Sequence, residues 1–133
     1  MTHKRTVAIV DETSSGARAD AWMLHVAEER LTLRELIRRR VFQEVAEYNA
    51  RQGGTFQGLV RPTDTEAMLN GYARKAPRRI DPERQSELAV EAFGRNGFLI
   101  FVGDRQIEEL EEEIDLALGT EVVFLRLVAL VGG

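Results

Sequence analysis

The stretch FLIFVGDRQIEELEEEIDLALGTEVVFLRLVALVGG, residues 98–133, contains most of the information about the fold. Residues 98–103 are a short apolar run of the kind that fills a buried strand. A turn, an acidic connector and a second turn follow. Residues 121–130 then predict a last strand that leads toward Gly132 and Gly133. The alternation of a strand assigns its residues to two faces: Val123, Leu125 and Leu127 on one, and Val122, Phe124 and Arg126 on the other.

The N-terminal half predicts a hairpin followed by a helix. Residues 5–11 and 21–27 are β-rich runs joined by a stretch rich in turn formers. Residues 31–51 predict the main helix, because Thr32 and Glu35 form a capping box in which each side chain satisfies a backbone N–H. Apolar residues at intervals of three and four make one stripe along this helix: Leu33, Leu36, Ile37, Val41, Val45 and Tyr48.

The region from about 52 to 96 separates this helix from the next strand. Gly53 and Gly54 are expected to end the main helix, and a short helix is expected around 64–70. A further helix begins with Asp81 as its cap and Pro82 at its first position. The inward side chains expected on it are Leu88, Val90 and Phe93. The whole pattern predicts an α+β domain: a sheet packed on one main helix, with a partly helical insertion.

Length and composition point to a single domain, residues 1–133, without disulfides. At 133 residues the chain has room for one hydrophobic core, and it contains no cysteine. A net charge of −4 argues against nucleic acid as the main partner. No apolar run approaches the roughly 20 residues of a membrane helix, so no membrane partner is expected. The first residues lack a signal-peptide apolar region, so a cytoplasmic location is expected.

The titratable residues form no recognisable catalytic set, and we expect that the protein is not an enzyme. His25 lies in the hairpin and is expected to point outward. Ser14 and Ser15 lie in a turn without a nearby base in the sequence. The acidic residues between 108 and 113 are interpreted as a solvated connector rather than a metal site.

Two stretches resemble the ubiquitin-like β-grasp family. LTLRELI (31–37) is similar to the helix entry of that family. FLIFVGDRQIE is similar to a ubiquitin strand and its glycine-containing turn, and IDLALGTEVVFLRL followed by GG is similar to the L-x-x-G-[DT]-E-V pattern of the molybdopterin and thiamine sulfur carriers. The resemblance covers roughly residues 5–50 and 97–133. It implies a β-grasp mixed sheet with an insertion at about 52–96 and a C-terminal tail at 128–133. The tail lacks the arginines of ubiquitin and the prolines of the molybdopterin carrier.

The resemblance, to bacterial modifiers above all, implies that this chain is itself a substrate, a protein modifier activated at Gly133. An E1-like enzyme would adenylate the Gly133 carboxylate with its own ATP and pass it to a target amine, and no intrinsic cofactor is needed. Glycine at 132 and 133 suits a narrow channel because it has no Cβ. An E2-like enzyme, a JAB-type peptidase and target proteins are the further expected partners.

A docking surface is expected beside the tail. We expect Phe124 and Arg126 on an exposed outer face of the sheet. Leu130 and Val131 are expected to pack into a partner groove by strand addition, and Val128 is expected to take part in partner binding. Alternatively, Val128 and Ala129 complete the last strand.

Two alternatives to the modifier remain open. A sulfur carrier would form a thiocarboxylate at Gly133, which the G-T-E-V turn and the apolar tail favour. A non-covalent binding module would use only the sheet surface. The sequence also leaves open the target, the oligomeric state, and whether the native chain ends at Gly133 or is processed to it.

Overall fold

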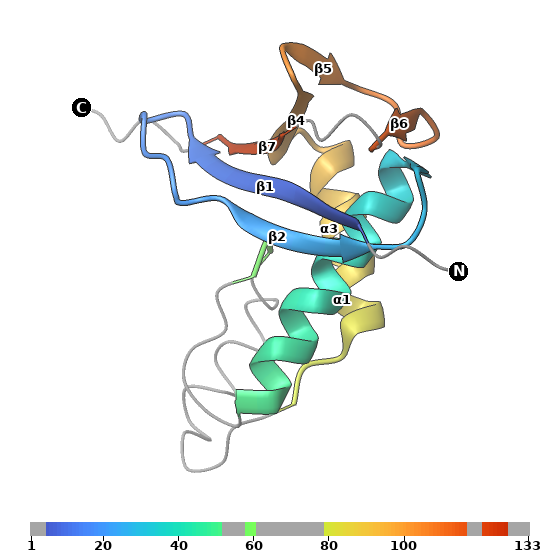
Figure 1. The fold of residues 1–133 in the computed structure, drawn as a ribbon. Helices are drawn as coiled ribbons and strands as arrows, with labels where there is room; N and C mark the ends of the chain where they lie inside the picture. Colours follow the sequence, from blue (N-terminus) through green and yellow to red (C-terminus); the bar gives the residue numbers. More distant parts are fainter. Residues whose placement is uncertain (1–4, 52–57, 61–78, 117–120, 128–133) are drawn as a thin grey trace, which may run out of the picture.

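The computed structural model describes residues 5–51, 58–60, 79–116 and 121–127 (Figure 1). Strands and helices follow one another in this order: β1 (Arg5–Thr13), β2 (Trp22–Val26), β3 (Arg30–Thr32), α1 (Leu33–Arg51), α3 (Pro82–Gly94), β4 (Phe98–Val102), β5 (Arg105–Ile107), β6 (Glu113–Asp115) and β7 (Val122–Arg126). The predicted α+β class is confirmed, as are the hairpin, the main helix and the two longer C-terminal strands.

The described strands form a larger sheet of five strands in the order β2-β1-β7-β4-β5. The last strand, β7, lies at its centre, parallel to β1 and antiparallel to β4. The register pairs Thr13 of β1 and Phe98 of β4 with Arg126. The C-terminal ends of β1 and β7 therefore lie together at one end of the sheet. A mixed sheet packed on a helix in this way is compatible with a β-grasp-like arrangement.

A second, two-stranded sheet of β3 and β6 lies at the start of α1, and the sequence did not predict it. The acidic connector caps the start of α1. The carbonyl oxygens of Glu112 and Leu110 accept hydrogen bonds from Leu33 N and Arg34 N, each at 2.9 Å. Thr32 Oγ1 accepts from Glu35 N at 3.2 Å, as predicted. The Glu35 carboxylate instead accepts from Arg39 Nε at 2.8 Å. Backbone carbonyls of the connector thus satisfy two further N–H groups at the start of α1, which the predicted capping box did not include.

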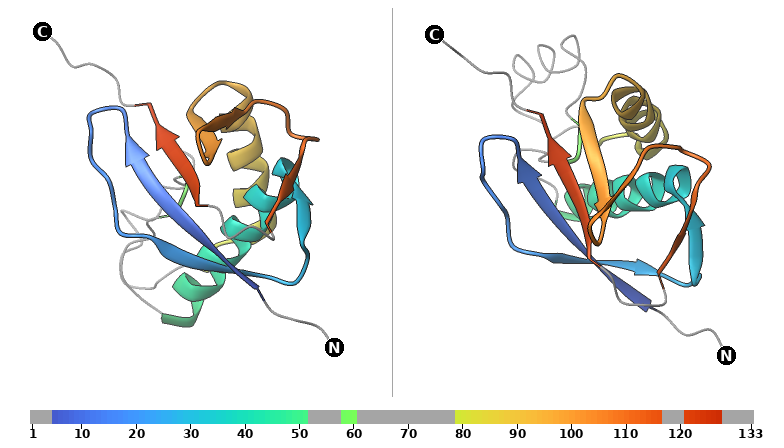
Figure 2. Two further views of the ribbon diagram at one scale, coloured as in Figure 1. Left: turned by 45° about the horizontal axis from the view of Figure 1, so that its top comes forward. Right: turned by 90° about the horizontal axis from the view of Figure 1, so that it is seen from above.

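The core lies between the larger sheet and the two described helices, which cover the same face of it (Figure 2). The predicted stripe of α1 is buried throughout, from Leu33 to Tyr48. It packs against the inward residues of β1, β2, β4 and β7. The hydrophobic period of the sequence therefore identified this face of the helix correctly.

The helix α3 belongs to the insertion and begins as predicted. Asp81 is its cap, and its side chain accepts a hydrogen bond from Glu83 N at 3.0 Å. The predicted inward residues were correct in part. Val90 and Phe93 are partly buried and pack against the core. Leu88 is also partly buried but does not belong to this group. The buried residues of α3 are Gln85, Ser86 and Ala89. Small and slender side chains on this face allow α3 to pack closely against α1.

The alternation along β7 is as predicted, but the face assigned to the surface was wrong. Phe124 is 0 % exposed, and its ring centroid lies 5.9 Å from that of Phe98. Val122 is buried beside it, whereas Val123 and Leu125 are partly buried on the opposite face. The helices cover the Phe124 face of the sheet, so Phe124 is a core residue and not part of an exposed patch.

Several predictions lie outside the described residues: the helix stop at Gly53 and Gly54, the short helix around 64–70, and the tail at 128–133. The main helix ends at Arg51. Within the described ranges, no helix is long and apolar enough to cross a membrane.

Candidate functional site

The end of β7 is held from two sides, and we call Arg126 and Leu127 the tail root. Arg126 O accepts a hydrogen bond from Ser14 N at 2.9 Å, and Leu127 N donates to Gly97 O at 3.4 Å. Leu127 is 47 % exposed, one of the large apolar side chains that the described surface leaves in solvent. The last described residues of the chain are therefore anchored to the β1–β2 turn and to the end of the α3 region.

The Arg126 side chain holds a segment of the insertion against the tail root. Its Nη2 donates to Gly58 O at 2.7 Å and to Leu59 O at 2.8 Å. Arg126 Nε is buried without a hydrogen-bond partner in the part of the chain that the structure describes. The expectation that Arg126 belongs to an exposed docking face is wrong, because the side chain is partly buried and its Nη2 hydrogen-bonds to these carbonyls.

A buried group of charges lies next to this contact. Arg40 of α1 is 1 % exposed and donates two hydrogen bonds to Asp11 of β1, at 2.6 and 2.8 Å. It also pairs with Glu44 at 3.2 Å, and Glu44 accepts from Leu59 N at 3.1 Å. The Arg40 guanidinium lies 4.4 Å from the Phe124 ring centroid and 5.3 Å from that of Trp22. Asp11, Arg40, Glu44 and the backbone of Leu59 thus form a continuous polar network that extends from the buried Arg40 to the partly exposed Asp11 at the edge of the core.

Burial and neighbouring charges shift the pKa values of Glu44 and Arg40 for different reasons. Burial raises the pKa of Glu44 above its ordinary value of 4.5, and the charge of Arg40 offsets this only in part. Burial by itself would lower the pKa of Arg40, but the hydrogen bond to Asp11 and the charge of Glu44 outweigh it and raise that pKa. Arg40 therefore stays charged in the core, and Glu44 is the group of the pair that takes up a proton more readily than usual.

The sequence analysis missed this network, although its pattern contains a signal for it. Arg40 follows Leu36 by four residues and Ile37 by three, so the helical period places it on the buried stripe. Asp11 follows Ile9 by two residues and so shares the inward face of β1. A basic and an acidic residue on two facing core surfaces predict a pair.

No described helix covers the outer face of the sheet (Figure 2), and this face is apolar over β4 and β7. The register places Leu99 and Phe101 of β4 beside Leu125 and Val123 of β7. All four are partly buried, and we call them the outer patch. They occupy the face that the sequence analysis had assigned to Phe124.

Ion pairs bound the same face on its β1 side. Arg18 pairs with Glu12 and, at 2.8 Å, with Glu121, the residue just before β7. Val10 lies between them in the register and is 0 % exposed, although it faces away from the helices. The outer patch on β4 and β7 is one apolar part of this face, and Met23 of β2, which is 49 % exposed, is another.

One edge of the sheet is closed by a side chain. Gln43 of α1 accepts a hydrogen bond from His25 N at 3.1 Å and donates to Met23 O at 2.9 Å. These are backbone groups of β2, the edge strand, which another strand would otherwise use. The predicted outward position of His25 is confirmed, since its side chain is exposed.

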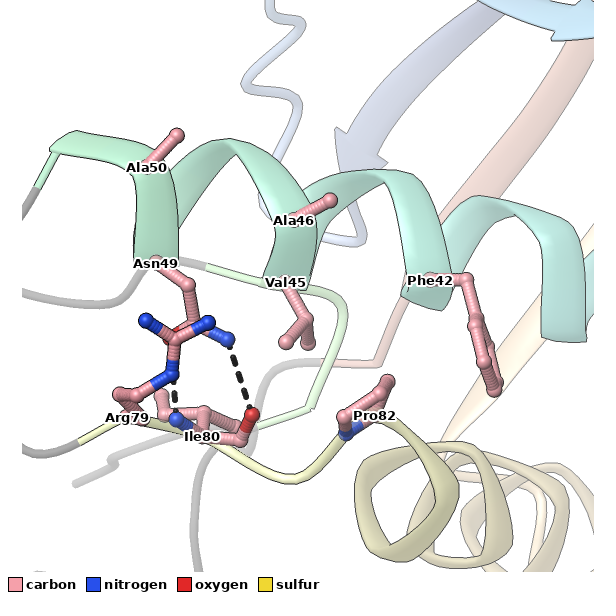
Figure 3. A pocket seen from close by; sticks show the side chains of 8 residues that line it. All are labelled: Phe42, Val45, Ala46, Asn49, Ala50, Arg79, Ile80 and Pro82. Carbon is pink, nitrogen blue, oxygen red and sulfur yellow. Dashed lines mark hydrogen bonds between the residues drawn. The ribbon is translucent and has the colours of Figure 1, made fainter.

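A cavity of about 520 Å³ lies between α1 and the start of α3 (Figure 3). Asn49 holds its wall through two hydrogen bonds with the backbone of Ile80, at 3.0 and 3.1 Å. Among the described residues that line it, most are apolar and Arg79 is the one that carries a charge. These described residues include no nucleophile and no acid–base pair.

The remaining predicted site residues fall on the tail. Val128, Leu130, Val131, Gly132 and Gly133 lie outside the described residues, and their predicted roles stay predictions. Across residues 5–51, 58–60, 79–116 and 121–127, no group of three metal-ligating side chains occurs.

Comparison of the chain with protein-family models, with curated proteins and with solved structures finds no match.

Proposed function

We propose that this protein is a ubiquitin-like β-grasp modifier whose Gly133 carboxylate is activated by an E1-like enzyme and transferred to target amines. One observation carries the proposal. The central strand β7 ends at a fixed tail root, immediately before the segment that contains Gly132 and Gly133. A last strand in this position delivers the tail from the rigid centre of the sheet.

The arrangement of the elements supports the β-grasp assignment. An N-terminal hairpin precedes a helix that packs on the sheet, and the first and last strands lie side by side and parallel. The insertion adds α3 to the same face without interrupting the strand order. Fold alone does not establish function, so the proposal depends on the tail chemistry.

The proposed reaction has two steps. The Gly133 carboxylate attacks the α-phosphorus of ATP, a new C(O)O–P bond forms, and pyrophosphate leaves. An amine of the target, or first a cysteine of the enzyme, then attacks the carbonyl carbon. AMP leaves with the electron pair of the broken bond, and the amine loses a proton as the amide forms. Gly133 needs a free carboxylate, either as the chain's last residue or after processing by a peptidase.

The outer patch and Leu127 are the docking surface that we propose for the activating enzyme, in place of Phe124 and Arg126. An apolar patch next to the tail root allows one partner to bind the sheet while its active site binds the tail. Val128, Leu130 and Val131 are then available to pack into the partner's groove. An E2-like enzyme and a JAB-type peptidase remain proposed partners.

The small number of lysine amines on this chain also favours transfer to other proteins. Lys4 and Lys75 are its only lysines. Scarce lysine limits conjugation of one copy to another, although a GC-rich genome would produce the same bias toward arginine.

Intact mass spectrometry tests the proposal. The full chain is incubated with ATP and lysate of its native host, beside a chain that lacks Gly132 and Gly133. A Gly94→Ala variant is the matched control, because an added Cβ meets nothing within 4 Å at Gly94. We expect ATP-dependent protein adducts with the full chain and with Gly94→Ala, and none with the truncated chain.

Other results would assign another function. A mass increase that matches one oxygen replaced by sulfur makes the protein a sulfur carrier. Identical partner binding by the full and truncated chains, without any mass change, makes it a non-covalent binding module.

A further inference from the structure

We propose that the cavity between α1 and the start of α3 binds a small organic acid, that is, a carboxylate on a short apolar chain. The volume of the cavity, about 520 Å³, lies within the roughly 300–1,000 Å³ that is typical of small-molecule sites. The described residues that line it belong neither to the tail root nor to the outer patch. This inference therefore does not depend on the proposed modifier function.

Contacts between α1 and the start of α3 fix the walls of the cavity relative to each other. Asn49 of α1 makes two hydrogen bonds with the backbone of Ile80, at 3.0 and 3.1 Å. Arg38 of α1 donates to Glu83 of α3 at 2.8 Å. The central carbon of the Arg38 guanidinium also lies 4.3 Å from the ring centroid of Phe42, which lines the cavity. A site that is held in place before binding loses less conformational freedom when a ligand enters.

The polar and the apolar side chains of the lining lie at opposite ends of the cavity (Figure 3). Asn49 and Arg79 lie at one end, and Phe42 and Pro82 lie at the other. Val45 lies between them on the wall that α1 forms. A ligand that complements this arrangement has a polar head beside Arg79 and an apolar body that reaches toward Phe42.

The polar end of the cavity selects the charge of the ligand. The guanidinium of Arg79 has only N–H donors and no acceptor. The side-chain oxygen of Asn49 already accepts from Ile80 N, and one of its amide N–H groups donates to Ile80 O, which leaves the other N–H for a ligand. None of the described lining residues is acidic. Two donors and a positive charge favour an anionic acceptor, and a carboxylate matches the planar guanidinium with two parallel hydrogen bonds.

The test follows backbone amide chemical shifts of the full chain by NMR while one of three probes is added. Octanoate carries both the carboxylate and the apolar chain. Its neutral counterpart 1-octanol lacks the charge, and acetate lacks the chain. The variant is Arg79→Gln, which removes the positive charge at an exposed position. Arg84→Gln is the matched control, because Arg84 is an exposed arginine near the start of α3 that does not line the cavity.

We expect octanoate to produce saturable shifts at the amides of Ala46, Asn49 and Ile80, which line the cavity. Binding of 1-octanol should be weaker, and acetate should produce no saturable shift. Arg79→Gln should raise the Kd of octanoate roughly tenfold, as expected for the loss of a hydrogen bond to a charged group at a partly hydrated site. The same variant should leave the Kd of 1-octanol unchanged, and Arg84→Gln should bind both probes as the wild-type chain does.

Three results would overturn the inference. The first is the absence of saturable octanoate binding at millimolar concentrations, or saturable shifts that occur only away from the cavity. The second is equal affinity for octanoate and 1-octanol, because the site would then not recognise the carboxylate. The third is an equal loss of affinity in Arg79→Gln and Arg84→Gln, because general attraction between charges would then explain the binding.

Discussion

The buried guanidinium of Arg40 lies against the face of Phe124 and makes two hydrogen bonds, at 2.6 and 2.8 Å, to the carboxylate of Asp11, which is 29 % exposed. This pair joins α1 to β1 at the position where β1 pairs with β7. The desolvation of a buried ion pair costs free energy that its attraction often does no more than offset. The pair therefore fixes how α1 sits on the sheet more than it adds net stability.

Removing one member of this pair should be severe. Arg40→Ala leaves the carboxylates of Asp11 and Glu44 without their cation and opens a cavity beside Phe124. We expect the free energy of unfolding to fall by about 3–5 kcal/mol, as for other broken buried pairs. Urea unfolding followed by circular dichroism measures it. Arg34→Ala is the matched control, because Arg34 is an exposed residue of the same helix and pairs with the exposed Glu111. This substitution should lower the free energy of unfolding by less than about 1 kcal/mol. Similar losses in the two variants would show that the buried pair has no special role.

Glu44 should give the stability a recognisable dependence on pH. Its folded pKa is raised, so just above the ordinary value of 4.5 the folded chain keeps a proton that the unfolded chain has lost. Stability falls with rising pH in such a window, because the folded state binds more protons. The contribution of Glu44 is therefore fully present below pH 4.5 and is lost as pH rises through the folded pKa.

The variant Glu44→Gln isolates this effect. Gln cannot titrate, yet its amide oxygen can still accept from Leu59 N. We expect the wild-type free energy of unfolding, minus that of Glu44→Gln, to decrease as the pH rises above the ordinary value of 4.5 in urea unfolding experiments. The lowered pKa of Glu28 produces the opposite slope, but it is common to both proteins and cancels in the difference. A difference that stays constant or rises with pH would contradict the raised pKa.

Local patterns in the sequence predicted the helices and longer strands, and they failed where long-range packing decides. The period of α1 and the cap at Asp81 were correct, because both depend on residues close in sequence. The three-residue strands β3 and β6 were missed, since neither has a pattern of its own and each exists through its partner. For β7, alternation gave two faces and no means to choose between them. Helices from elsewhere in the chain cover the Phe124 side, and only the structure shows this.

Gln43 should keep the molecule from associating through β2. Its amide occupies His25 N and Met23 O, the groups by which the edge strand would pair with another chain. We expect Gln43→Ala to lower the free energy of unfolding by below about 1.5 kcal/mol, since water reaches both groups. It should also produce concentration-dependent dimers, measured by size-exclusion chromatography with light scattering. Glu47→Ala is the control, because Glu47 contacts Gln43 but not the strand. A Gln43→Ala protein that stays monomeric at every concentration would show that other features protect this edge.

Phe124 and Leu125 are neighbours on β7, and substitutions at the two positions should separate effects on stability from effects on docking. Phe124→Ala removes a fully buried ring, and we expect the free energy of unfolding to fall by about 3–5 kcal/mol. Leu125→Ser changes a partly buried side chain of the outer patch and should cost below about 1.5 kcal/mol. If the outer patch is the docking surface, Leu125→Ser should raise the half-saturating concentration for adduct formation in host lysate roughly tenfold, the equivalent of a binding hot spot of about 1.4 kcal/mol. Val10→Ala is the control on the same face, because Val10 is 0 % exposed and does not belong to the outer patch. Normal adduct formation by Leu125→Ser would move the docking surface away from this face of the sheet.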